Sequence, residues 1–207
     1  MCKIRIINLI MQIFLLNKNI SIADKELSDQ HVVVSSKELM QILSTVWYVC
    51  DRDKFAKYFA EGKLVKQWTV PSHPSIRWAM ASLENYWFVV GYLAELFEEF
   101  ELRRKKQHAY HKHMYSFVNE FGDPSLPMFN ETKAKEENWR FNIKYDDVVP
   151  MSKTYQAIKN QTLKSDNPVI SYRRYYIVDK AYFAKWTWLR PMPEWFKQRN
   201  EYYNHSW

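Results

Sequence analysis

His31 and Glu38 are the residues whose types and spacing most suggest chemistry. They lie seven residues apart in a segment with helical periodicity, so both side chains fall on one side of a helix, about two turns apart. Both border an apolar stripe, where partial desolvation raises the pKa of a carboxyl group. Such a group is suited to proton transfer or to stabilising a cationic transition state. The same spacing also fits two ordinary solvated groups.

The C-terminal part of the chain interleaves cations with aromatic rings. Lys and Arg attract phosphates in a salt-dependent way, and exposed rings stack on unpaired bases. This mixture is typical of nucleic-acid binding, although a core helix with a solvated basic face has the same composition. The candidate DNA-binding residues in this run are Arg173, Arg174, Tyr175, Tyr176, Lys185 and Trp186.

His73 and Arg77 are a second pair of candidate DNA contacts. His73 precedes Pro74, and Arg77 follows in the first turn of a long periodic segment. The simpler interpretation is a loop histidine and a surface arginine.

We expect neither a metal site nor a cofactor. His108, His111 and His113 form a cluster, but no Cys, Asp or Glu stands nearby at ligand spacing. The chain has no glycine-rich phosphate loop, which argues against a nucleotide kinase. With only Cys2 and Cys50, it has too few cysteines for a disulfide framework, so a reducing compartment such as the cytoplasm fits best.

Composition predicts a mainly α protein, a compact helical bundle. The 207 residues are 47% hydrophobic, enough to bury one core, so we expect a single domain over 1–207. Three glycines and 17% aromatic residues favour long helices over a turn-rich β-sandwich. The net charge of +7 is common in proteins that meet phosphate backbones or anionic membrane surfaces.

The periodicity divides the chain into a few segments. Residues 1–10 are an extension, and 11–16 read as a short strand. Helices are predicted over 21–49 with Ser21 as N-cap, over 51–61 ending at Gly62, and over 75–107. Residues from about 122 to 150 read as an irregular insertion. The apolar run 4–16 resembles a signal-peptide core, but it lacks a cleavage site and is too short to span a bilayer, so we expect no membrane role.

The segment Leu27-Ser28-Asp29-Gln30-His31, followed by Lys37-Glu38, resembles the first helix of the phage endonuclease V family, the pyrimidine-dimer DNA glycosylases and lyases. The similarity extends through Gly62-Lys63-Leu64-Val65, through Pro74, and into the basic cluster 103–106 and the aromatic C-terminal run, while 108–171 is unmatched.

The resemblance implies an endonuclease V-like fold and assigns roles to three residues. Glu38 would be the catalytic carboxylate, and His31 and Lys37 would contact DNA near the lesion or its phosphates. Lys37 stands where the family has an arginine, and Gln41 replaces a second one. Arg77 is a candidate substitute for that missing cation.

The family's nucleophile is an α-amine at the mature N-terminus, which attacks C1′ of the sugar. An α-amine suits this task because its pKa lies near neutrality. If translation starts at Met11, Gln12 would present this amine after Met removal. If it starts at Met1, Cys2 would present it, ten residues further from the helix.

Two functions follow, with a third kept open. The first is a monomeric DNA glycosylase that binds damaged or modified double-stranded DNA and cleaves the N-glycosidic bond of a pyrimidine, with an accompanying lyase step. The second is a phage or viral protein that uses the same scaffold for nucleic-acid binding or structural work without chemistry. The third is an enzyme acting on modified pyrimidines or nucleotides. The first requires His31 and Glu38 to open into a positively lined groove.

Overall fold

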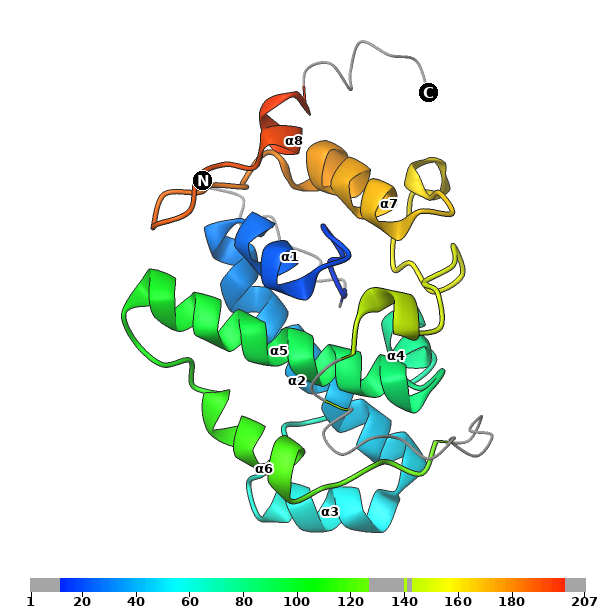
Figure 1. Cartoon of the computed structure of the whole chain (residues 1–207). Helices are drawn as coiled ribbons and strands as arrows, with labels where there is room; N and C mark the ends of the chain where they lie inside the picture. The colour runs from blue at the N-terminus through cyan, green and yellow to red at the C-terminus, as the bar shows by residue number, and fades with distance from the viewer. Residues whose placement is uncertain (1–11, 127–139, 141–142, 200–207) are drawn as a thin grey trace, which may run out of the picture.

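The computed structural model describes residues 12–126, 140 and 143–199 (Figure 1). These residues form eight α-helices with short 3-10 turns, one π-helical turn and no β-strand, so the prediction of a mainly α protein is confirmed. The α-helices are α1 (Ile20–Glu26), α2 (Asp29–Cys50), α3 (Arg52–Ala60), α4 (Pro74–Ala79), α5 (Leu83–Arg104), α6 (Met114–Asn119), α7 (Pro168–Tyr175) and α8 (Glu194–Lys197).

The short strand predicted over 11–16 is absent from residues 12–16, which are buried without pairing to another strand. Side chains satisfy their backbone carbonyls instead. Tyr92 Oη donates to Phe14 O at 2.8 Å, and Arg173 Nε donates to Leu16 O at 2.9 Å. Met11 and the extension 1–10 lie outside the described residues.

Two of the predicted helices are each divided in the structure. The segment 21–49 forms α1 and α2, because Leu27 and Ser28 adopt extended backbone angles between them. The N-cap of α1 is Asn19 rather than Ser21. The segment 75–107 forms α4 and α5, and the Ser82 side chain caps α5.

The remaining boundaries follow ordinary stop signals. Gly62 adopts φ +69° directly beyond α3, which agrees with the predicted glycine stop. The described part of 122–150 contains the 3-10 turn η3 (Tyr145–Asp147). None of the helices in the described ranges has the length and apolarity needed to cross a bilayer.

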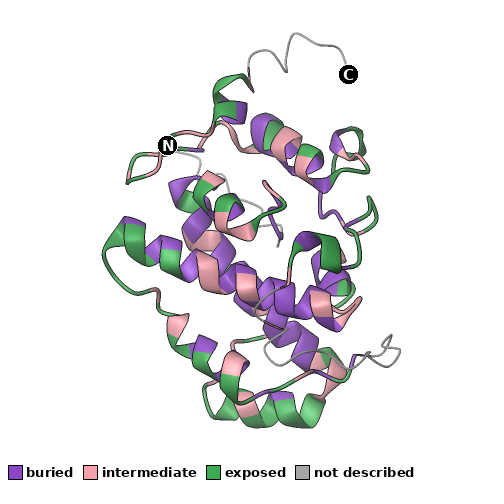
Figure 2. Cartoon of the chain, in the orientation of Figure 1, coloured by how far each residue is buried: buried purple, intermediate pink, exposed green. Residues whose placement is uncertain are grey.

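The core lies where α2 and α5 cross near the middle of the molecule (Figure 1). Large rings fill it, and the indole of Trp47 on α2 donates to Tyr86 Oη on α5 at 3.0 Å, so a polar atom in the core is satisfied. Figure 2 shows the purple buried residues concentrated on these two helices, whereas α3 at the lower end is mostly exposed.

Arg103 joins four segments from the end of α5. Its fully buried guanidinium donates to Glu99 Oε1 at 2.6 Å and to Asp29 Oδ1 at 3.1 Å. It also donates to the backbone carbonyls of Lys25 and Leu27, which end α1. Asp29, the first residue of α2, accepts from the backbone and hydroxyl of Thr187 in the C-terminal segment. Arg103 therefore fixes the break between α1 and α2 and the position of α2.

We predict that Arg103→Met lowers the free energy of unfolding by at least about 3 kcal/mol, because it leaves the buried carboxylate of Asp29 without its cationic partner and removes one of the two arginines that pair with Glu99, the other being Arg190. Denaturant titration measures this value. The matched control is Lys106→Met in the same basic cluster, where the side chain is exposed and we expect a change below about 0.5 kcal/mol. Equal effects of the two substitutions would contradict the role assigned to Arg103.

Candidate active site

Glu38 on α2 is a buried carboxyl group that contacts the start of the described chain. Its side chain is 5% exposed, and its Oε2 accepts a hydrogen bond from the backbone nitrogen of Gln12 at 3.1 Å. Burial raises the pKa of Glu38 to about 7, against the opposing effects of the Gln12 hydrogen bond and the charges of Lys180 and Lys37. A carboxyl group with this pKa can both accept and donate a proton at neutral pH.

The side chain of Gln12 lies in the same buried region. Its amide nitrogen donates to Ala157 O at 2.7 Å, whereas its Oε1 has no hydrogen-bond partner within the described chain. A buried acceptor without a partner costs roughly 1–3 kcal/mol, and such groups gather at functional sites. Glu38 therefore lies beside the backbone of Gln12, one of the two residues at which the sequence analysis expects a nucleophilic amine.

His31 is enclosed by aromatic rings, unlike the solvent-facing imidazole expected from sequence. The rings of Phe14, Tyr176 and Phe183 lie 4.6, 4.8 and 5.1 Å from it, centroid to centroid. Burial lowers the pKa of His31 to about 3, with a further contribution from the charge of Lys180. The imidazole is therefore neutral, and among the described residues both His31 and Glu38 are buried rather than open to the predicted groove.

Tyr176 connects the imidazole to the start of α2. Its hydroxyl accepts from the backbone nitrogen of Ser28, the N-cap residue, at 2.8 Å, and it hydrogen-bonds His31 Nδ1. This contact fixes the first turn of α2 against the C-terminal helix, so the ring of Tyr176 is a core group.

A π-helical turn, η5 (Tyr176–Lys180), follows α7 directly. Hydrogen bonds in a π turn run from residue i to i+5, which widens the turn, and such turns often occur at functional sites. Here the turn brings Lys180 over one ring that precedes the turn and one that follows it. Its ammonium lies 5.0 Å from the ring centroid of Tyr175 and 5.9 Å from that of Phe183. We call Phe14, His31, Tyr175, Tyr176 and Phe183 the aromatic cage.

The other sequence-predicted residues of this region divide into surface and structural groups. Lys37 and Lys185 are exposed. Tyr175 is buried. Trp186 is half-buried and donates to Glu26 O at 3.2 Å, and Arg174 is also half-buried. Lys37 and Lys185 are therefore the predicted DNA contacts of α2 and the C-terminal run whose side chains reach the surface freely.

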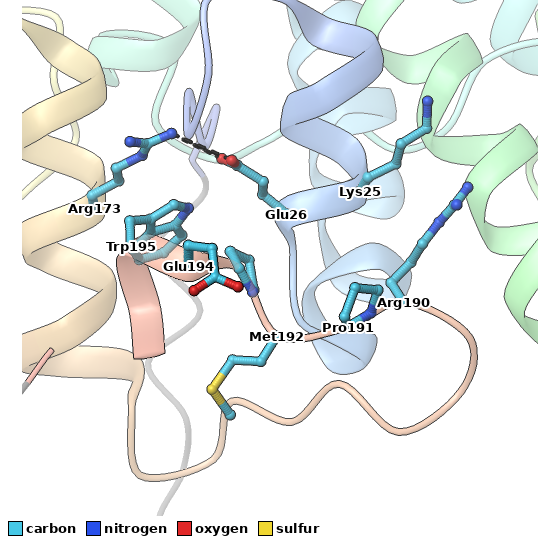
Figure 3. Close-up of a pocket in the computed structure, with 9 residues that line it drawn as sticks. Lys25, Glu26, Arg173, Arg190, Pro191, Met192, Glu194 and Trp195 are labelled. Carbon is cyan, nitrogen blue, oxygen red and sulfur yellow. Dashed lines mark hydrogen bonds and ion pairs between the residues drawn. The ribbon is translucent and has the colours of Figure 1, made fainter. Parts of the chain in front are cut away.

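Arg173 holds α7 against α1. It donates to Leu16 O and pairs with Glu26 at 3.2 Å. Figure 3 shows this pair at one wall of a pocket of about 550 Å³ between α1 and the Pro191–Trp195 segment. None of the predicted catalytic residues lines this pocket.

His73 and Arg77 lie on α4 and its N-cap. The Nδ1 of His73 accepts from the backbone nitrogen of Ser75, which makes His73 the N-cap residue, and burial lowers its pKa. Arg77 is exposed, with its guanidinium 5.8 Å from the ring of Tyr155. Arg77 is thus available for phosphate contacts, whereas the ring of His73 is engaged in capping.

A surface groove of about 650 Å³ runs between the first turns of α2 and the C-terminal segment. Val33 and Val34 of α2 line it, as do Lys185 and Tyr182, which is 65% exposed. Arg104 also lines it, stacked 4.2 Å from Trp188. Phe183 both lines this groove and contacts His31, so the groove adjoins the aromatic cage.

Among the residues that the structure describes, no group of three or more His, Cys, Asp or Glu side chains is arranged to hold a metal ion. The histidines after α5 have other contacts. His108 Nδ1 accepts from the backbone nitrogen of Tyr110, and His113 Nδ1 hydrogen-bonds Lys63 O.

Two contributions were missed by sequence reasoning. Lys180 was recognisable as one cation of an aromatic run, but nothing in the sequence marks a π turn. Asp29 belongs to the motif that carries the family resemblance, yet its carboxylate pairs with Arg103, 74 residues away. Because the sequence predicts one helix over 21–49, Asp29 is not expected at a helix start, and no sequence signal indicates this pairing.

No protein-family model matches the chain, and comparisons with curated proteins and with solved structures find no match either.

We predict that Glu38→Gln stabilises the protein more at pH 8 than at pH 5. The folded-state pKa of about 7 exceeds the ordinary 4.5, so the folded protein binds more protons between these values and loses stability as pH rises through 7. The neutral amide avoids this loss. From the pKa difference, the advantage of the variant grows by roughly 2 kcal/mol between pH 5 and pH 8.

Paired denaturant titrations at the two pH values measure this difference. The matched control is Glu98→Gln, because Glu98 is exposed on α5 and its substitution is expected to show no such pH dependence. A pH-independent effect of Glu38→Gln would contradict the desolvated carboxyl group.

Proposed function

We propose that this protein is a DNA glycosylase of the endonuclease V type, which cleaves the N-glycosidic bond of a damaged or modified pyrimidine in double-stranded DNA. The observation that carries the proposal is the contact between Gln12 N and the buried Glu38 carboxyl group, whose pKa is about 7. A chain beginning at Gln12 would carry its α-amine at this atom, beside the carboxyl group that the resemblance assigns to catalysis.

Glu38 has the properties that glycosidic cleavage needs. As a carboxylate it stabilises the positive charge that develops on the sugar as the base departs, and low local polarity strengthens that interaction. As an acid or base with a pKa near neutrality it exchanges a proton with the leaving base or with water. The same burial that destabilises the ionised carboxylate makes it an effective partner for a cationic transition state.

The contacts of His31 suit a positioning role rather than direct contact with DNA. The neutral ring packs in the aromatic cage and forms a hydrogen bond with Tyr176, which also binds the N-cap of α2. His31 then sets the orientation of the helix that carries Glu38 two turns further on. These contacts support a positioning role for His31, whereas the resemblance implied that His31 contacts DNA.

The DNA-binding surface in this proposal combines the groove beside Tyr182, lined by Arg104 and Lys185, with two exposed cations outside that lining, Lys37 on α2 and Arg77 on α4. Lys37, Arg77, Arg104 and Lys185 supply phosphate contacts, and the exposed ring of Tyr182 supplies a stacking surface. Because His31 and Glu38 are both buried, the glycosylase proposal requires DNA binding and base extrusion to expose the Glu38 carboxyl group to the sugar.

A second function is favoured by the burial of both His31 and Glu38, which are 6% and 5% exposed. In this alternative the chain binds nucleic acid through the same cationic surface, and Glu38 has no chemical role. Both functions include nucleic-acid binding, but only the glycosylase cleaves an N-glycosidic bond.

Base release and strand cleavage on duplexes with a thymine dimer, an abasic site or a modified pyrimidine distinguish them. We expect turnover on at least one substrate, reduced at least 100-fold by Glu38→Gln and unchanged by Glu98→Gln. Salt-dependent binding without turnover on any of the three would support the second function and contradict the first.

We also predict that Lys37→Met and Lys185→Met each reduce the slope of log Kobs against log salt concentration by about 1, because each removes one phosphate contact. Fluorescence anisotropy with a labelled duplex at several salt concentrations gives the slope. Lys57→Met on α3, at the other end of the molecule from α7 (Figure 1), is the control with no expected change. An unchanged slope in both test variants would place the DNA elsewhere.

A further inference from the structure

The groove beside Tyr182 has the size and lining of a ligand site. Its volume of about 650 Å³ lies within the range of about 300–1,000 Å³ that is usual for such sites. Gln30, Val33 and Val34 line it from α2, and their spacing of three and four residues places them on one face of that helix. Gln30 is exposed and the two valines are half-buried. The helix therefore presents an apolar strip and one amide group to the groove.

Tyr182 adds an aromatic surface to the same groove. Its side chain is 65% exposed, and its ring meets that of Phe183 nearly at a right angle, with the centroids 4.8 Å apart. An exposed ring can stack on a nucleobase. In a duplex each base is already paired and stacked on its neighbours, so a base that enters a groove of this kind must be unpaired. The ring therefore favours single-stranded nucleic acid.

Two cations line the groove without forming ion pairs within the described chain, Arg104 and Lys185. The guanidinium of Arg104 lies 4.2 Å from the ring centroid of Trp188. Stacking fixes the plane of a guanidinium while its N–H edge can still donate to a phosphate. Lys185 is exposed and supplies a second, more flexible positive charge. These two side chains suit a phosphate group next to the aromatic surface.

Among the described residues that line the groove, Asp29 is the one carboxylate, and its charge is compensated. Its Oδ1 accepts from the buried guanidinium of Arg103 at 3.1 Å. Its Oδ2 accepts from the backbone nitrogen and the hydroxyl of Thr187 at 2.6 and 2.8 Å. The charges of Arg104 and Lys185 are therefore not cancelled inside the groove, and the site attracts an anion.

We infer that this groove binds an unpaired nucleotide of single-stranded DNA. The base stacks on Tyr182 next to Val33 and Val34, and the adjoining phosphate binds Arg104 and Lys185. The inference goes beyond the duplex binding proposed above and rests on the proposed function for the choice of DNA alone. It requires no chemistry at Glu38.

Fluorescence anisotropy of the 207-residue protein with three labelled ligands of equal length tests this inference. The ligands are a thymidine oligonucleotide of about 12 nucleotides, an oligomer of abasic units with the same phosphates, and an adenine–thymine duplex. We expect the thymidine strand to bind at least about tenfold more tightly than the abasic oligomer and the duplex, because only this strand offers unpaired bases together with phosphates.

Substitutions at Tyr182 separate stacking from phosphate contacts. Tyr182→Leu should weaken binding of the thymidine strand at least about fivefold and leave the abasic oligomer within about twofold, whereas Tyr182→Phe keeps the ring and should bind like the unmodified protein. Arg104→Met should weaken binding of both oligomers. The matched control is Tyr115→Leu, because Tyr115 is also 65% exposed but lies on α6, at the other end of the molecule from α7 (Figure 1).

Equal affinity for the thymidine strand and the abasic oligomer would overturn the inference, as would tighter binding of the duplex. Unchanged binding by Tyr182→Leu, or an equal loss in Tyr115→Leu, would overturn it too. Because Tyr182 is exposed, its substitution leaves the core intact. Base release from lesion-containing duplexes is measured separately, so failure of single-strand binding leaves the glycosylase proposal standing, and absence of base release leaves this inference standing.

Discussion

The buried guanidinium of Arg103 is the interaction on which the other contacts depend. It binds the carbonyls that end α1, the carboxylate that begins α2, and Glu99 on its own helix, while Asp29 in turn binds the C-terminal segment at Thr187. An arginine removed from water is tolerated only when its donors are satisfied. These segments are thereby held in one arrangement, and the aromatic cage and Glu38 are positioned by it.

Glu38 is a buried carboxyl group whose ionised form is destabilised by its surroundings. The carboxyl group is buried beside Gln12, and burial is the largest effect on its pKa, exceeding those of the hydrogen bond and the nearby cations. Ionisation above neutral pH therefore costs folding free energy, and packing elsewhere must compensate. Asp24 is similar, since burial raises its pKa to about 7 as well, but its carboxylate binds the adjacent backbone nitrogen of Lys25 and lies on a different helix from Glu38.

Local signals predicted the helical class, the stop at Gly62 and the placement of His31 and Glu38 on one helix. The features that could not be predicted from the sequence depend on tertiary contacts. The break at Leu27 and Ser28 contains neither proline nor glycine, and it is stabilised by Arg103 and Tyr176, which are distant in sequence. The burial of His31 depends on rings from both ends of the chain. Lys180 reaches the cage through a π turn, whose pattern is not encoded in composition or periodicity.

The most direct test of this account is the titration of the Glu38 carboxyl group, followed by ¹³C NMR in protein labelled at glutamate side chains and assigned by the loss of one signal in Glu38→Gln. The account predicts a midpoint near pH 7, raised by burial beside the Gln12 nitrogen. A midpoint near the ordinary value of about 4.5 would show a solvated carboxylate and contradict the site from which the proposed chemistry is derived.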